Sequence, residues 1–190
     1  MTPSQIKWIL STHYFLYFGI LGIYLPYFNL YCYHLDFSGF QIGTLSALRT
    51  MATALFPLIW GALADRYNIR RPIFLFSVIA SAAVWSLYLT TTDFWTMFAI
   101  TACYGIFYAP IISFLESFSM DLLSGDKSNY GRLRVWGSIS FIGTVIIVGR
   151  VIDMTSAAII LVLILAGSII QSYMATKMPR TAPQQQARSS

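Results

Sequence analysis

Six long stretches of mostly apolar residues occupy most of this chain of 190 residues. They cover residues 8–31, 41–63, 72–89, 94–122, 135–151 and 156–174. A helix that crosses a membrane needs about 20 such residues, and in hydrocarbon every backbone N–H and C=O must be paired within the protein. We therefore expect each stretch to be a membrane-spanning helix, and the short connections between them leave no room for a soluble domain.

The composition agrees with this assignment. Charged residues make up 10% of the chain, against about 25% in a soluble domain, and the mean hydropathy is +0.66. So few charges cannot solvate the surface of a soluble fold, and the high apolar fraction excludes intrinsic disorder. The sequence predicts an all-α, multi-pass membrane protein in which residues 1–175 form a six-helix bundle and residues 176–190 form a polar cytoplasmic tail.

The basic residues predict how the bundle is oriented. If the N-terminus is cytoplasmic, 10 of the 12 Lys and Arg residues lie on the cytoplasmic side; of the other two, Arg150 lies outside and Arg49 lies within the second helix. Cytoplasmic loops are enriched in Lys and Arg, so both termini are predicted to be cytoplasmic, in the cell inner (plasma) membrane. The net charge of +5 expresses this bias and does not indicate nucleic-acid binding.

Residue sets for enzyme chemistry are missing from the sequence. Cys32 and Cys103 have neither the number nor the spacing of a disulfide framework or metal site, and His13 and His34 lie near opposite ends of the first helix. The chain also has no Ser/His/Asp set and no phosphate-binding loop. We therefore expect no enzyme activity, no catalytic residues, no metal and no cofactor.

Arg49 lies about 9 residues into the second apolar stretch, close to the membrane midplane at about 1.5 Å per residue. A charged residue at this depth is costly and faces the bundle interior or a wet cavity. Arg49 is either part of a site for an anionic ligand or a coupling ion, or one partner of an internal ion pair that fixes the packing.

Glu116 and Arg134 are predicted to pair across the fourth and fifth helices. They lie at similar depths, and a connection of twelve residues lets the two helices be antiparallel neighbours. A desolvated carboxylate beside an arginine is a plausible proton or solute site. The alternatives are a purely structural bridge for Glu116 and a headgroup anchor for Arg134. The pair is expected to be buried enough that removing one partner leaves an uncompensated charge.

The turn between the second and third helices contains Gly61, Asp65, Arg66, Arg70 and Arg71. Gly61 is expected to allow close helix contact, and Asp65 to cap or attract the N-terminus of a neighbouring helix. Arg70 is expected to pair with Asp121 at the same level. We interpret this turn as a conformational-switch loop; an ordinary positively charged turn is the alternative.

Four tyrosines are candidates for a solute cavity: Tyr24, Tyr27, Tyr104 and Tyr108. Such rings stack on a sugar or an aromatic solute, but core packing and the interfacial aromatic belt explain them as well. Small residues at helical spacing are expected instead to serve close helix packing; they are Ala102, Gly105, Ala109, Gly137, Ser140 and Thr144.

Three motifs resemble a known family. The pattern G-x-x-x-D-R-x-x-x-R-R at residues 61–71 is similar to the signature loop of the major facilitator superfamily, although Asn68 and Ile69 replace its usual Gly and Arg. Residues 25–31, followed by Gln41-Ile42-Gly43, resemble the phenylpropionate-permease-like branch. Residues 130–138 carry the G-R-x-R pattern of that branch and of oligosaccharide–proton symporters.

The resemblance implies a fold and a mechanism. Members have twelve helices in two six-helix halves, bind the solute between the halves and work by alternating access. Arg134 matches the arginine that holds the sugar in the symporters. Glu116 matches their helix 4 acid when residues are counted back from the motif, whereas counting forward from Pro110 selects Ser113.

With six helices, this chain corresponds to the N-terminal half of the major-facilitator fold, and its polar tail resembles the linker between halves. The expected function is one component of a secondary transporter that moves a small organic solute (a sugar, nucleoside or aromatic acid) with a proton. A second six-helix half is the expected partner. The alternative is a truncated or transport-silent membrane protein that at most pairs with a full-length or complementary half.

Overall fold

The computed structural model describes residues 2–123 and 127–179, and within these the chain forms helices and no strands. The elements are α1 (Pro3–His34), α2 (Gly39–Tyr67), α3 (Arg70–Ser86), the 3-10 turn η1 (Leu87–Thr90), α4 (Phe94–Tyr108), α5 (Pro110–Leu122), α6 (Lys127–Met154) and α7 (Ile159–Thr176). In this part of the chain, six spans are long and apolar enough to cross a membrane, which is the expected number. Residues 180–190 of the expected tail lie outside the described residues.

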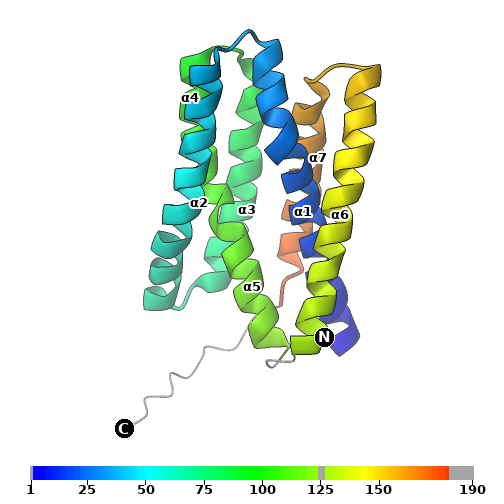
Figure 1. Ribbon diagram of the computed structural model, residues 1–190. Coiled ribbons are helices and arrows are strands. Elements are labelled where there is room, and N and C mark those ends of the chain that lie inside the picture. Colours follow the sequence, from blue (N-terminus) through cyan, green and yellow to red (C-terminus); the bar gives the residue numbers. More distant parts are fainter. Residues whose placement is uncertain (1, 124–126, 180–190) are drawn as a thin grey trace.

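The helices form one bundle in which successive membrane spans run up and down alternately, α4 and α5 together making one span, so that α1 and α6 lie side by side in the same direction (Figure 1). We call the end at which α1 begins the N-terminal end; the α2–α3 turn and the end of α7 lie there too. α1 contacts α2, α5, α6 and α7, most extensively α6. The residues of α1 that face the core include Tyr17, Tyr24 and Tyr31.

Several helices extend beyond the apolar stretches from which they were expected. α6 starts at Lys127 and α1 starts at Pro3. At the start of α1, the Thr2 side chain accepts a hydrogen bond from the Gln5 N–H, and the Gln5 side chain accepts one from the Thr2 N–H. This reciprocal cap pairs two N–H groups that have no partner within the helix, so polar residues can begin a helix whose centre lies in lipid.

The expected single helix over residues 94–122 is divided at Ala109 into α4 and α5. Pro110 causes the break, because proline has no N–H to donate and its ring clashes with the carbonyl four residues earlier. That carbonyl belongs to Ile106, and the Trp60 indole Nε1 donates a hydrogen bond to it over 2.9 Å. A side chain from α2 therefore satisfies the backbone group that the proline leaves unpaired.

Small residues hold the helices close together, as their spacing predicts. Ser140 Oγ donates to the Phe15 carbonyl of α1 over 2.6 Å. Gly137 lies against the Phe18 ring, and Gly105 of α4 lies against Ala52 of α2. Each contact needs the small side chain, because a larger one would push the two backbones apart.

The turn between α2 and α3 contains Asn68 in the left-handed backbone conformation, with φ 55°. Glycine is the residue best suited to this conformation, and asparagine is among the few others that adopt it routinely. The departure from the usual glycine of the signature loop therefore preserves the shape of the turn.

Gly105→Ala is expected to destabilise the bundle. A Cβ at this position would lie 2.5 Å from the Ala52 Cβ, so α2 and α4 would have to separate, and overpacking of this kind costs about 1–3 kcal/mol. Gly143→Ala is the matched control, because a Cβ there meets nothing within 4 Å. Thermal unfolding of both variants in detergent measures the difference; equal midpoints would contradict the close α2–α4 contact.

Candidate functional site

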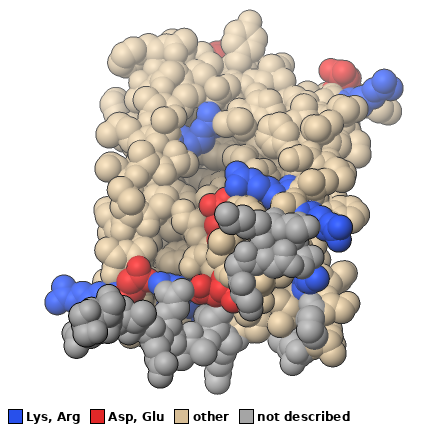
Figure 2. All heavy atoms as spheres, turned by 60° about the horizontal axis from the view of Figure 1, so that its bottom comes forward, with Lys and Arg blue, Asp and Glu red and all other residues tan. Residues whose placement is uncertain are grey.

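Polar and charged side chains from α1, α2, α5 and α6 form the candidate site. Figure 2, which brings the N-terminal end forward, shows acidic and basic side chains gathered around a hollowed part of the surface. Two groups contribute to the site. One contains Arg49 of α2, and the other contains Glu116 of α5 and Arg134 of α6.

Arg49 lies over the ring of Tyr24, with its guanidinium carbon 5.0 Å from the ring centroid. Such a contact attracts a cation to the aromatic face but does not neutralise it. Within residues 2–123 and 127–179, no Asp or Glu forms a salt bridge with Arg49. The expected alternative of an internal ion pair is therefore not found among the described residues, and no carboxylate there neutralises the Arg49 guanidinium.

Asn29 and Ser46 extend the polar surface beside Arg49. Ser46 Oγ donates to Asn29 Oδ1 over 3.2 Å, which joins α2 to α1. Ser46 precedes Arg49 by three residues, so both lie on one face of α2. The sequence did not single out either residue, because isolated amide and hydroxyl side chains are common in helices; only the position of Asn29 within the second motif marked it.

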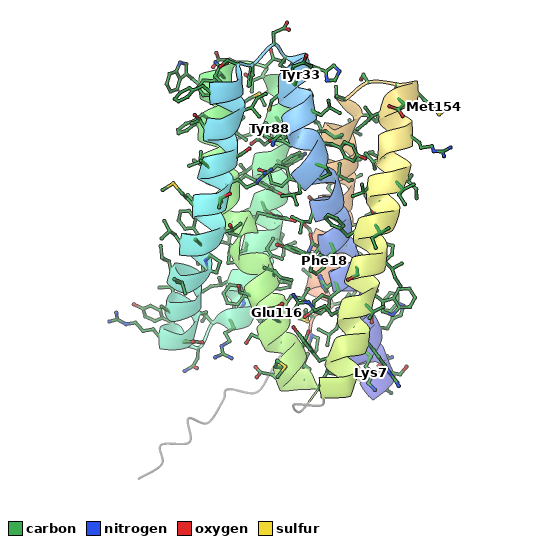
Figure 3. The ribbon with its side chains drawn as sticks, in the orientation of Figure 1. Lys7, Phe18, Tyr33, Tyr88, Glu116 and Met154 are labelled. Atoms are coloured by element: carbon green, nitrogen blue, oxygen red, sulfur yellow. The ribbon has the colours of Figure 1, made fainter. Side chains whose placement is uncertain are left out.

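Glu116 and Arg134 form the predicted pair, with Arg134 Nη1 3.1 Å from Glu116 Oε1. Tyr130, one turn before Arg134, joins them: Arg134 Nη1 donates to its hydroxyl over 3.1 Å, and that hydroxyl donates to Glu116 Oε1 over 3.5 Å. Figure 3 places Glu116 in the part of the bundle nearer the N-terminal end. Sequence reasoning missed the bridging role of Tyr130 because nothing marked the direction of its hydroxyl.

The expectation that this pair is buried enough for removal of one partner to leave an uncompensated charge is wrong for this chain. The side chains of Arg134 and Glu116 are 54% and 37% exposed. Both belong to helices at the edge of the hollowed surface, so solvent reaches them from the side that no helix of this chain covers. Their attraction is screened accordingly, and each keeps capacity for a further hydrogen bond.

Three of the four candidate tyrosines belong to an aromatic cluster inside the bundle. Tyr104 and Tyr108 are stacked with centroids 4.9 Å apart, and Tyr24 meets Tyr104 edge-on at 5.4 Å. Tyr24 is only 2% exposed, so its ring contacts Arg49 from the buried side. In this chain the cluster fills the core, as the packing interpretation expects, and Tyr24 is the member in contact with a charged site residue.

Tyr27 faces a different neighbour. Its hydroxyl donates to the Val145 carbonyl of α6 over 2.6 Å, and its ring lies beside Gly149. Pro26 precedes it within α1. Tyr27 therefore connects α1 to α6 through a hydrogen bond to backbone.

The switch-loop residues form an ion network at the N-terminal end. Arg70 Nη2 lies 2.7 Å from Asp65 Oδ1, and Arg70 Nη1 lies 3.4 Å from Asp121 Oδ2, which confirms the expected Arg70–Asp121 pair. Asp65 does not cap α3, whose first residues have no side-chain cap; it pairs with the Arg70 side chain. One arginine thus connects the end of α2 to α5.

Gly61 and Arg66 take no part in the ion pairs that Arg70 forms. A Cβ at Gly61 would meet nothing within 4 Å, so the expected close helix contact is absent from the part of the chain that the structure describes. Arg66 is exposed, and its guanidinium lies 5.7 Å from the Tyr67 ring centroid. Both residues are therefore open to a partner outside this bundle.

Arg71 has a role that the sequence did not show. Its Nε donates to the Met178 carbonyl over 2.8 Å and its Nη2 donates to the Thr176 carbonyl over 3.1 Å. Thr176 is the last residue of α7, where helix carbonyls lack partners within the helix, and Met178 lies two residues beyond it. The two adjacent arginines of the loop thus hold two different elements, α5 and α7. Among the described residues, no cluster of His, Cys, Asp and Glu could hold a metal.

A family model described as the MFS_1 like family matches residues 7–190. Maltose permease of Geobacillus stearothermophilus is 26% identical over 177 residues, covering 92% of this chain and 44% of that protein. A probable 3-phenylpropionic acid transporter of Escherichia coli is 24% identical over 173 residues, covering 88% of this chain and 44% of that protein. These relatives are permeases and transporters, not enzymes.

The crystal structure of nucleoside transporter NupG has the same fold over 97% of this chain, with a TM-score of 0.86 and 22% identity. The match covers 47% of the NupG chain. This chain therefore spans about half the length of the relatives that it matches.

The exposure of the Glu116–Arg134 pair predicts a small effect on stability. Glu116→Gln, Arg134→Gln and the double variant should each lower the free energy of unfolding by less than about 1 kcal/mol, because a solvent-exposed pair contributes little. Arg150→Gln, which alters an exposed arginine at the opposite end, is the control. Denaturant unfolding in detergent measures these values. Breaking a buried pair costs about 3–5 kcal/mol; a loss of that size in one single variant, restored in the double, would contradict the exposed geometry.

Proposed function

Because this chain belongs to the major facilitator superfamily of membrane transporters, in its MFS_1 like family, we propose that it is the N-terminal half of a secondary transporter. The solute is a small organic molecule: a sugar, a nucleoside or an aromatic acid. Transport is by alternating access with proton symport. The relatives that support this range are a maltose permease, a probable 3-phenylpropionic acid transporter and a nucleoside transporter.

The observation that carries the proposal is the unneutralised Arg49 in a membrane-spanning helix. A charge at this depth is expensive unless it serves a ligand or a pathway. Its neighbours are the Tyr24 ring and, one turn away, the Ser46–Asn29 hydrogen bond. Together they offer a cation, an aromatic support and polar groups, which suits a solute with hydroxyl or carboxylate oxygens beside an apolar surface.

Glu116 and Arg134 form the second contact region for the solute. A guanidinium can donate two parallel hydrogen bonds to vicinal oxygens of a solute, and a carboxylate accepts from hydroxyl groups. The same carboxylate can take a proton when the arginine moves to the solute, which couples solute binding to proton binding. Tyr130 keeps the two groups in one hydrogen-bonded unit until the solute arrives.

The ion network around Arg70 is proposed as the switch. It lies at the N-terminal end of the bundle, away from Arg49. Forming or breaking the ion pairs of Arg70 therefore changes the relative position of α2 and α5 without contact with the solute. A second six-helix half completes the cavity. In the most apolar 18 residues of each span, 11% are buried in α2 and 17% in α6, against 56% in the α4–α5 span. The least buried helices thus flank the candidate site.

Two variants should separate solute binding from switching. Arg134→Lys should abolish solute binding, because lysine lacks the planar fork. Asp65→Asn should slow transport while leaving solute affinity within a few-fold. Counterflow of labelled maltose, uridine and 3-phenylpropionate in vesicles measures both, with this chain alone and with a six-helix partner half.

The results for the two variants decide which role each residue has. Full activity in Arg134→Lys removes Arg134 from the site and leaves it a headgroup anchor, since lysine reaches the interface equally well. A large loss of affinity with normal turnover in Asp65→Asn contradicts the switch. Transport of no solute with any partner half favours the transport-silent alternative.

Both termini are proposed to be cytoplasmic, with the bundle in the plasma membrane. The N-terminal end carries Arg66, Arg70, Arg71, Arg132 and Lys177, whereas Arg150 lies towards the opposite end. A reporter enzyme that is active only in the cytoplasm, fused after Ser190, should therefore be active. A reporter active only outside the cytoplasm serves as the control, and activity of that fusion would overturn the orientation.

A further inference from the structure

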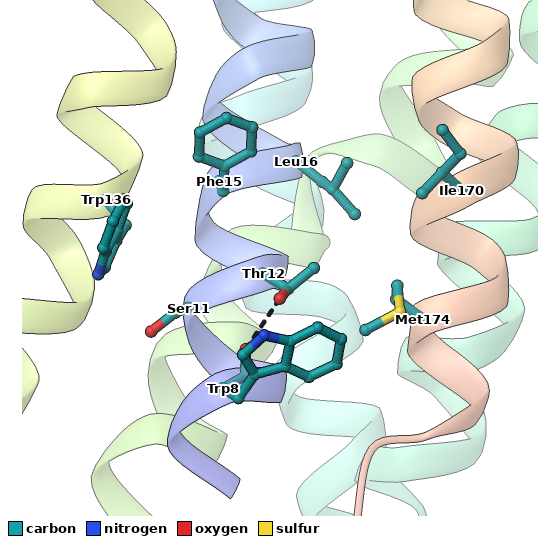
Figure 4. A pocket seen from close by; sticks show the side chains of 8 residues that line it. All are labelled: Trp8, Ser11, Thr12, Phe15, Leu16, Trp136, Ile170 and Met174. Carbon is teal, nitrogen blue, oxygen red and sulfur yellow. Dashed lines mark hydrogen bonds between the residues drawn. The ribbon is translucent and has the colours of Figure 1, made fainter. Parts of the chain in front are cut away.

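A groove runs along α1 between α6 and α7, separate from the candidate solute site. Figure 4 shows its deeper part, with Trp136 of α6 on one side and Ile170 and Met174 of α7 on the other. This part has a volume of about 370 Å³. A second part of about 790 Å³ continues it towards the N-terminal end, and both parts are lined by Trp8 and Met174. The two parts therefore adjoin at Trp8 and Met174, and we describe them together as one groove.

Both parts of the groove are lined mainly by apolar side chains. Phe15, Leu16 and Ile170 line the deep part, with the hydroxyls of Ser11 and Thr12 among them. The part at the N-terminal end adds a charge, because Lys177 lines it together with Gln5 and Ile9. This distribution matches an amphiphile whose hydrocarbon lies along the groove and whose anionic head lies beside Lys177.

The length of the groove matches one leaflet of a bilayer. Gln5 and Leu16 are eleven residues apart on α1, which corresponds to about 16 Å of helix. The hydrocarbon core is about 30 Å thick, so the groove spans about half of it. Trp8 is 63% exposed and lies where the two parts of the groove meet; exposed tryptophans are enriched at the membrane interface.

Basic side chains lie at the end of the groove where the polar head of such an amphiphile would lie. Lys177 lies in the groove, with its ammonium 5.2 Å from the Tyr173 ring centroid. Lys7 lies at the same end of α1 (Figure 3). The sequences of α1 and α7 contain no Asp or Glu, so neither helix carries a carboxylate that would repel an anionic head.

The groove opens away from the candidate solute site. Trp136 lies two residues after Arg134, which is about 200° around α6. Arg134 points to Glu116 of α5, so Trp136 points to the opposite side. The surface that a second half is proposed to cover and the groove are thus on different sides of α6, and the groove faces lipid.

We propose that this groove, the α1–α7 groove, is a binding site for an anionic glycerophospholipid of the leaflet on the N-terminal side. One acyl chain lies along Phe15 and Leu16 between Trp136 and Ile170, and the phosphate lies beside Lys177. The proposal does not depend on transport, since it rests on the shape, polarity and charge of a surface outside the candidate solute site.

Native mass spectrometry of the purified 190-residue chain tests the proposal. The probes are phosphatidylglycerol and phosphatidylcholine, added to delipidated protein in detergent. The chain should retain phosphatidylglycerol at least threefold more than phosphatidylcholine. Lys177→Gln should remove this preference, and Ser11→Phe, which fills the groove, should remove the bound lipid whatever its headgroup.

Matched controls keep the test independent of folding. Arg150→Gln removes a basic residue at the opposite end, and Ala62→Phe adds a ring to an exposed position of α2; both should bind lipid like the unchanged chain. If Ser11→Phe fails to fold, Leu16→Trp fills the same groove from the next turn. Equal retention of both lipids by the unchanged chain, or equal losses in Lys177→Gln and Arg150→Gln, overturns the proposal. Increased lipid binding after removal of residues 180–190 would also overturn it, because the tail would then be the occupant.

Discussion

Close contact between α1 and α6 is the interaction on which the candidate site depends. Lipid is as apolar as the helix surfaces, so the hydrophobic effect does little to bring membrane helices together, and tight packing with hydrogen bonds must do so. Gly19 and Gly22 of α1 face Ser140 and Phe141 of α6 with almost no space between them. The opposite face of α1 can then direct its tyrosines into the core, where Tyr24 meets Trp85 and supports Arg49.

Proline placement determines how the two contact regions are positioned. Glu116 belongs to α5, whose direction is set at the Pro110 break rather than by α4. Trp60 of α2 stabilises this break through the Ile106 carbonyl, and Arg49 belongs to the same helix as Trp60. The two candidate contact regions are therefore connected through one indole-to-carbonyl hydrogen bond, in addition to the packing between α2 and α5.

The fold was predictable from the sequence, because apolar length forces helices in lipid. The pairs were predictable where both partners are charged and share a depth, as for Glu116 with Arg134 and Arg70 with Asp121. Their exposure was not predictable, because it depends on which faces the other helices leave uncovered. Tyr130 and Arg71 were missed for a related reason. Tyr130 takes part through an uncharged hydroxyl, and the partners of Arg71 are backbone carbonyls, so neither contact leaves a pattern of opposite charges in the sequence. Pro110 was visible, but Trp60, which donates to the carbonyl freed by the proline, was not a predictable partner because it is 46 residues away in the sequence.

α6 meets three different environments, which explains why so lightly buried a helix carries such different residues. Gly137, Ser140 and Gly149 face α1, where only small side chains fit. Arg134 and Tyr130 contact Glu116 at a partly exposed surface, where polar side chains are favourable. Trp136 and the exposed Ile139, Ile142 and Ile146 cannot be explained by either environment; they require an apolar environment outside this bundle, which for Trp136 is lipid. Because residues two apart on a helix point in nearly opposite directions, Arg134 and Trp136 can serve an aqueous surface and a lipid surface from a single turn. A substitution in this turn should therefore be interpreted by the face that it alters, not by its distance from Arg134 along the sequence.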